Sequence, residues 1–138
     1  MDRRNKEGYL DLTAHEALTN VVRSEKAKNY KPLVYIASPY AGDIERNTER
    51  ARQYCRFAVS QGFIPLAPHL HYPQFMDEAD AKQRKLGLRF ALILLGKCDE
   101  LWVFGSYISK GMKREIATAE RRGIKTKYFE NGGLHDEK

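Results

Sequence analysis

Apolar residues in this chain fall into short continuous runs, separated by longer stretches in which they recur at helical spacing. The runs are residues 33–38 (LVYIAS), 63–68 (FIPLAP), 100–105 (ELWVFG) and 124–129 (IKTKYF). Short apolar runs that are rich in β-branched and aromatic residues and bounded by glycine or proline are typical of buried strands. The pattern therefore predicts four strands.

The stretches between these runs predict helices at 43–62, 81–98 and 111–123. In the first helix the predicted core stripe consists of Ile44, Ala51, Tyr54, Cys55, Ala58 and Val59. Residues 69–80 contain too many breakers to form an element, so a long loop is predicted there. Strands that alternate with helices are typical of a parallel sheet with right-handed crossovers.

The ends of the chain differ from this body. Residues 1–30 read as a polar arm followed by a short helix, because "TAHE" at 13–16 has the spacing of a capping box and apolar residues recur after it. The expected organisation is an N-terminal arm and helix at 1–30, an α/β domain at 31–130 and a flexible tail at 131–138.

Composition narrows the class of protein. At 138 residues the chain is large enough for one domain with its own core, and its longest apolar run is too short to span a bilayer. No basic-then-apolar signal peptide opens the chain, so a cytoplasmic location is expected. Cys55 and Cys98 have no close partner in the sequence and are expected to be plain buried thiols. The net charge of +6 suggests an acidic partner, either a phosphate-bearing small molecule or a nucleic acid.

Ligands of parallel sheets bind at the carboxyl ends of the strands, which directs attention to loops 38–43, 68–80 and 105–111. The first loop, SPYAGD, contains neither a dinucleotide fingerprint nor a P-loop. Asp43 is well placed to cap the helix that follows it. Arg46 could meet a phosphate, or it could be a solvated helix arginine.

The second loop carries His69 and His71 beside Tyr72 and Phe75. Two histidines in this spacing could ligate a metal, but no acidic or cysteine partner stands nearby at metal-ligand spacing, so neither a metal nor an organic cofactor is expected. Hydrogen bonding to a sugar or phosphate is favoured for His69, and His71 could be merely structural.

The third loop, GSYISKGM, leaves a strand and enters a basic helix that contains one early acid, Glu115. Small residues and free N–H groups at a helix start form a natural anion site. Ser109 could equally be a helix cap, and Glu115 could be an acid that complements the helix dipole. Alternatively Glu115, held by a partner such as Tyr35, could attack a sugar carbon.

The segments VYIASPY, PLAPH and CDELWVFGSYISKGMKREIATA together resemble the nucleoside 2-deoxyribosyltransferase-like superfamily over residues 33–129. Within it the likeness is to the nucleotide N-glycosidases and deoxynucleoside 5'-phosphate N-hydrolases, and to small uncharacterised bacterial and phage proteins. The resemblance implies a flavodoxin-like (Rossmann-like) α/β three-layer sandwich with a four- to five-stranded parallel sheet, here with an N-terminal helical arm added. It also implies a homo-oligomer.

The resemblance further implies roles for single residues. Glu115 matches the nucleophile that attacks the anomeric carbon, and Tyr35 the tyrosine that positions it. Ser109, Gly111 and Glu115 keep the SxGxxxE spacing of the phosphohydrolases, whose serine and glycine amides hold a 5'-phosphate. Asp99 matches an aspartate that opens a strand, and His69 a histidine after the second strand. With the candidates that the three loops supply, the predicted substrate contacts are Ser38, Pro39, Tyr40, Arg46, His69, His71, Asp99, Gly105, Ser106, Ser109, Gly111 and Met112.

Two departures bear on the substrate. The transferases that use free nucleosides carry an aspartate where Ser109 stands, which favours a phosphorylated substrate here. The first loop lacks the glycine-rich run of the phosphohydrolases, which leaves the sugar and base contacts open. The donor of a proton to the leaving base also stays open among His69, His71, Asp99 and water.

The sequence thus predicts cleavage of the N-glycosidic bond of a nucleotide, by hydrolysis or transfer, through Glu115. A non-catalytic protein that binds or sequesters a nucleotide or an ADP-ribose-derived signal is the alternative. A nucleic-acid-binding module is disfavoured, because the basic residues are spread over several helices and no RNA- or DNA-reading motif appears.

Overall fold

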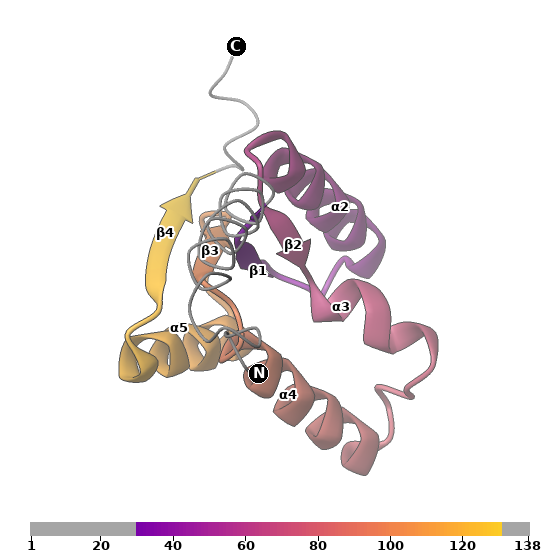
Figure 1. Cartoon of the computed structure of the whole chain (residues 1–138). Helices are drawn as coiled ribbons and strands as arrows, with labels where there is room; N and C mark the ends of the chain where they lie inside the picture. Colours follow the sequence, from indigo (N-terminus) through magenta and orange to yellow (C-terminus); the bar gives the residue numbers. More distant parts are fainter. Residues whose placement is uncertain (1–29, 131–138) are drawn as a thin grey trace, which may run out of the picture. The chain divides into compact units, whose positions relative to one another are not determined.

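The computed structural model of the chain describes residues 30–130 (Figure 1). The arm and helix predicted for residues 1–30 lie outside this range except for its last residue, and the predicted tail at 131–138 lies wholly outside it.

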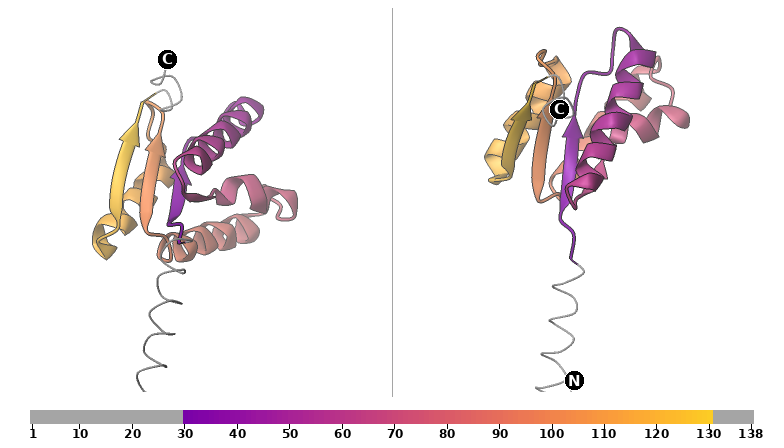
Figure 2. Two further views of the ribbon diagram at one scale, coloured as in Figure 1. Left: turned by 45° about the horizontal axis from the view of Figure 1, so that its top comes forward. Right: turned by 90° about the horizontal axis from the view of Figure 1, so that it is seen from above.

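Four strands form one parallel sheet: β1 (Leu33–Ala37), β2 (Ile64–Leu66), β3 (Glu100–Phe104) and β4 (Lys125–Phe129). Their order across the sheet is β2-β1-β3-β4. Figure 2 shows β1, β3 and β4 side by side with the same direction. The predicted α/β fold with a parallel, flavodoxin-like sheet is therefore confirmed.

The helices are α2 (Ile44–Ser60), α3 (Pro68–His71), α4 (Ala81–Leu95) and α5 (Lys110–Arg122), with a 3-10 turn, η1, at Tyr72–Gln74. The prediction of a structureless loop at 69–80 is wrong for its first half. Pro68 and Pro73, which read as breakers, each occupy one of the first two positions of a helical turn, where proline's fixed φ and missing N–H are well tolerated.

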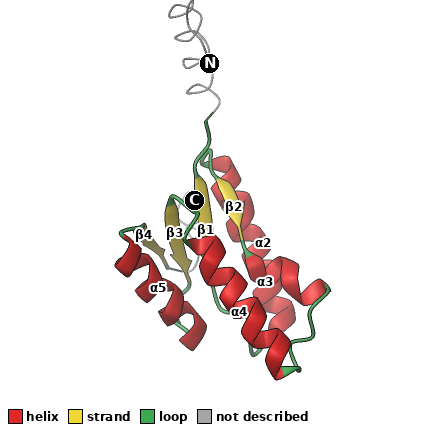
Figure 3. Cartoon of the chain, turned by 60° about the horizontal axis from the view of Figure 1, so that its bottom comes forward, coloured by secondary structure: helices red, strands yellow, loops and turns green. Residues whose placement is uncertain are grey.

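The two faces of the sheet are covered by different helices. Tyr35, Ala37, Leu101 and Val103 point toward residues of α4 and α5, whereas Val34, Ile36, Trp102 and Phe104 point toward α2. Figure 3 looks onto the face that α4 and α5 cover. The sheet and the helices on both faces make three layers, as predicted.

In the predicted core stripe of α2, the central residues are buried and the residues at both ends are exposed. Ala51, Tyr54 and Ala58 are buried and Cys55 is half-buried. Ile44 and Val59 are 48% and 61% exposed. Val59 follows Ala58 by about 100° around the helix, so it turns away from the sheet that Ala58 contacts, and Ile44 is the first residue of the helix.

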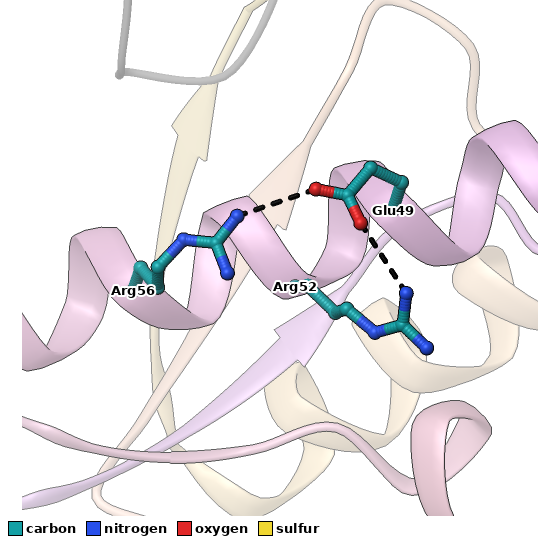
Figure 4. A network of polar contacts seen from close by, with 3 residues as sticks. All are labelled: Glu49, Arg52 and Arg56. Carbon is teal, nitrogen blue, oxygen red and sulfur yellow. Dashed lines mark hydrogen bonds and ion pairs between the residues drawn. The ribbon is translucent and has the colours of Figure 1, made fainter.

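The outer surface of α2 carries an arginine–glutamate network (Figure 4). Glu49 accepts from Arg52 and from Arg56, each at 3.3 Å between nitrogen and oxygen. These side chains are more than half exposed, so the pairs add at most about 1 kcal/mol each to the free energy of unfolding. The network belongs to the solvated surface.

The direction of the crossovers reverses at β1. The chain moves from β1 to β2 on one side and returns to place β3 on the other. The loops after β1 and after β3 consequently diverge at the carboxyl edge of the sheet, where open α/β sheets bind ligands.

Candidate functional site

A cavity of about 530 Å³ lies at this switch point, which is a usual size for a small-molecule site. Its walls come from the loop after β1, from α3 and η1, from the first half of α4 and from the start of α5. The residues predicted for the site that line it are Tyr35, Ser38, Pro39, Tyr40, His69, Ser109, Gly111, Met112 and Glu115.

The floor of the cavity holds a tyrosine–glutamate pair. The Tyr35 hydroxyl donates to Glu115 Oε2 at an O···O distance of 2.5 Å, joining β1 to α5 across 80 residues of sequence. Tyr35 is fully buried and Glu115 is half-buried, with the buried Met112 one turn before Glu115 on α5. The carboxylate is thus oriented by a hydrogen bond from a fully buried side chain.

Burial shifts both groups toward their neutral forms. It raises the pKa of Glu115 to about 7, although the hydrogen bond from Tyr35 acts to lower it. Burial and the charge of Glu115 raise the pKa of Tyr35, so its hydroxyl stays protonated and stays a donor. A carboxyl group that titrates near neutrality in a cleft is typical of functional sites.

His69 stands at the other side of the β1 end. Its Nε2 lies 3.3 Å from Ser38 Oγ, and its ring meets that of Tyr40 edge-on with centroids 5.8 Å apart. Burial lowers the pKa of His69 to about 4, so the ring is neutral near pH 7. It can offer or accept a hydrogen bond there, but it is a poor source of a proton.

A helix residue absent from the sequence prediction holds the loop after β1 in place. The Asn47 Nδ2 group donates to the carbonyl oxygens of Tyr40 and Ala41, both at 3.1 Å. Asp43 caps α2 by accepting from the N–H of Arg46 at 3.2 Å. Tyr40 therefore projects from an anchored backbone.

The start of α5 presents donors to the cavity. Ser109 caps the helix: its Oγ accepts from the N–H of Met112 at 3.2 Å, and its own N–H contacts the Met112 sulfur at 3.4 Å. The bonds that continue the helix begin with the N–H of Lys113 to the Ser109 carbonyl, so the N–H groups of Lys110 and Gly111 have no helical acceptor. These amides and the Lys110 ammonium can meet an anion.

Two glycines belong to the segment between β3 and α5. Gly105 follows β3 with φ +99°, a conformation that other residues rarely adopt, and lies outside the cavity lining. A Cβ on Gly111 would meet only Ser109 Oγ, at 4.0 Å. The missing side chain at Gly111 leaves the space beside the helix start open.

Five predicted site residues lie outside the cavity lining: Arg46, His71, Asp99, Gly105 and Ser106. Asp99 stands at the amino end of β3, where its carboxylate accepts from the N–H of Leu33 at 2.8 Å. The loops that bear the cavity follow the opposite ends of the strands, so Asp99 lies at the other edge of the sheet and outside the cavity lining. His71 instead packs against the rings of Tyr72 and Phe75, and Arg46 is exposed.

Several lining residues were absent from the prediction. They are Ala41, Gly42, Pro68, Tyr72, Pro73, Met76, Asp77, Glu78, Gln83, Arg84, Gly87, Leu88, Ala91, Tyr107 and Lys110. Most belong to the segment from α3 to the middle of α4. The first half of α4 mixes polar and apolar residues. This pattern could have indicated a cavity wall, because a helix that forms such a wall needs both kinds of residue.

Three further observations concern residues 30–130. No three histidine, cysteine, aspartate or glutamate side chains in this range gather where they could hold a metal ion. No helix in the same range has the length and hydropathy needed to cross a membrane. Cys98 is buried and Cys55 half-buried, and both thiols are free.

A family model described as "Domain of unknown function (DUF7768)" matches residues 32–129, and the chain belongs to this family. No curated protein matches the chain. Among solved structures it is similar to a 2-deoxyribosyltransferase from the psychrotolerant bacterium Bacillus psychrosaccharolyticus, with a TM-score of 0.58 and 17% identity. That likeness covers 73% of this chain and 74% of the other, and at this identity it shows a shared fold.

Proposed function

We propose that this member of a family of unknown function cleaves the N-glycosidic bond of a nucleotide, with Glu115 as the nucleophile. The observation that carries the proposal is the hydrogen bond of 2.5 Å from Tyr35 to Glu115 at the floor of a cavity at the switch point of the sheet. The solved structure of similar fold is a 2-deoxyribosyltransferase, and its name supports the same class of reaction for this chain.

The arrangement of the cavity supports a phosphorylated substrate. The phosphate would lie at the start of α5, on the N–H groups of Lys110 and Gly111 and beside the Lys110 ammonium. The sugar would then lie over Glu115, four residues further along the same helix. Binding energy from the remote phosphate would position the anomeric carbon against the carboxylate.

The reaction follows from that position. Glu115 in its ionised form attacks the anomeric carbon, the bond to the base breaks, and the electron pair leaves with the base, which takes a proton from water. A second water hydrolyses the resulting glycosyl ester and frees Glu115 and the sugar phosphate. Tyr35 donates to the Oε2 atom and so aims the carboxylate.

The test is release of free base. The wild-type protein is incubated with nucleoside and deoxynucleoside monophosphates, NAD and ADP-ribose derivatives, and the products are separated by chromatography. Glu115→Gln should lower the rate at least about 1000-fold, since removal of a nucleophile costs this much or more. Glu120→Gln is the matched control, because Glu120 is an exposed acid in the last turns of α5 and should react like wild type.

A second candidate is a protein that binds a nucleotide without turnover. It is favoured by the pKa of about 7 for Glu115, because a carboxyl that is half protonated at neutral pH can hold a ligand by donating a hydrogen bond. This candidate predicts no free base from any compound, together with a ligand that raises the melting temperature of the wild type and of Glu115→Gln alike.

A further inference from the structure

The loop between η1 and α4 carries three acidic residues, and the carboxylates of two of them accept hydrogen bonds. Asp77 Oδ1 accepts from the N–H of Ala79 at 2.9 Å. Asp80 caps α4, accepting from the N–H of Lys82 at 3.0 Å and from Gln83 Nε2 at 3.2 Å. Within residues 30–130 the carboxylate of the third acid, Glu78, makes no hydrogen bond or ion pair.

The backbone that bears Glu78 is nevertheless held firmly. Gln83 Oε1 accepts from the N–H of Asp77 at 2.8 Å, and Arg84 Nη1 donates to the carbonyl of Glu78 at 3.1 Å. Gln83 and Arg84 belong to the first turns of α4 and line the cavity wall. Two side chains thus fix the loop on either side of Glu78 and leave its carboxylate available.

Glu78 lines the same cavity as Tyr40, Tyr72 and Met76. Burial raises the pKa of Tyr40, and the negative charge of Glu78 raises it further, in keeping with their shared place in the cavity lining. The rings of Tyr40 and Tyr72 and the Met76 sulfur are surfaces on which a flat heterocycle packs well. These residues come from the loop after β1, from η1 and from the loop that follows η1, whereas the phosphate is placed at the start of α5.

These positions indicate where the base of the nucleotide would bind, an inference that rests on the proposed function. With the phosphate at the start of α5 and the sugar over Glu115, the base extends toward the remaining wall. We propose that Glu78 reads the edge of the base and selects bases that present N–H donors there, guanine first among them.

The selection follows from the chemistry of a carboxylate, which only accepts when ionised. Guanine offers its ring N1–H and its 2-amino group side by side, so both carboxylate oxygens find a donor, and such bidentate contacts discriminate strongly between bases. The N–H of uracil or thymine lies between two carbonyl oxygens, and these would face the carboxylate and repel it.

The test measures binding in the Glu115→Gln background, so that no turnover interferes. Dissociation constants for guanosine and uridine monophosphate are determined by calorimetry, with and without Glu78→Gln. We expect guanosine monophosphate to bind about 10-fold more weakly after Glu78→Gln, and uridine monophosphate to bind equally well or better, since an amide can also donate. Glu120→Gln in the same background should change neither constant.

Equal changes for the two nucleotides, or no change for either, would overturn the assignment. Glu78 is exposed, so its replacement by glutamine leaves folding intact and a loss cannot be attributed to misfolding. The base-release assay separates this inference from the proposed function. Selectivity that depends on Glu78 without any base release refutes the glycosidase alone, whereas base release with an unchanged guanine-to-uracil ratio of kcat/KM in Glu78→Gln refutes the role of Glu78 alone.

Discussion

The face of the sheet under α2 is closed by aromatic rings, whereas the face under α4 and α5 holds a carboxyl group beside a cavity. On the α2 face Tyr54 stacks on Phe104 at a centroid distance of 4.2 Å and Phe104 stacks on Phe129 at 4.8 Å. On the other face the buried residues include Ala37, Ala91 and Ala119, which fill less space.

The side chains of β1 contribute to both faces of the sheet. In β1 the side chains of Val34 and Ile36 enter the aromatic face, and Tyr35 and Ala37 enter the other. Each fully buried aromatic side chain contributes about 1.5–3 kcal/mol to the free energy of unfolding. The aromatic face can therefore offset the cost of holding Glu115 away from water. Substitutions on each face test whether one face mainly stabilises the fold and the other holds the carboxyl group.

The largest effect on stability is expected from Phe104→Ala. Phe104 is fully buried between two stacked rings, so its removal should lower the free energy of unfolding by about 3–5 kcal/mol. Denaturant titration measures this change. Tyr128→Ala, which removes a ring that is 60% exposed, is the control and should cost far less. A loss below about 1 kcal/mol for Phe104→Ala would contradict the anchoring role of this face.

The same division explains what the sequence could predict. Runs such as VYIA and LWVF are apolar on both sides because both faces are covered, so the strands and the parallel sheet were predictable from the hydrophobic pattern along the chain. Glu115 and Tyr35 were predicted as partners through the family resemblance, and the structure brings them to 2.5 Å.

The wall of the cavity was not predictable in this way. Gln83 and Arg84 bond to a loop whose path depends on the helical turns of α3 and η1. No periodicity in the sequence encodes that path. Asp99 was predicted for the site and lies outside the cavity lining for a related reason: a resemblance matches positions along a strand, whereas only the fold decides which end of the strand borders the cavity.

The second prediction concerns the pH dependence of stability. Folding raises the pKa of Glu115 from 4.5 to about 7, so between these values the folded state binds more protons than the unfolded state. Stability from this group therefore falls as the pH rises through that range. Relative to Glu115→Gln, the wild type should lose about 3 kcal/mol between pH values below 4.5 and above 7.

Unfolding of the two proteins by denaturant at a series of pH values measures this difference. His69, whose pKa falls to about 4 on folding, acts in the opposite direction between pH 4 and 6.5, but it is present in both proteins and cancels. A difference that stays constant with pH would mean that water reaches Glu115 freely. It would contradict the raised pKa of this carboxyl group in the folded protein.

The smallest effect, and the most discriminating, is expected from a pair of tyrosine-to-phenylalanine substitutions. Tyr35→Phe removes the donor that lowers the pKa of Glu115, so the rise of kcat/KM with pH should move upward by about 1 unit. Tyr54→Phe removes a hydroxyl from the aromatic face, where no hydrogen bond of that group is found within residues 30–130. It should leave the pH profile in place. If both variants moved the profile equally, the effect would come from general loosening of the sheet. A shift confined to Tyr35→Phe would tie the ionisation of Glu115 to one hydroxyl, on the face of the sheet that borders the cavity.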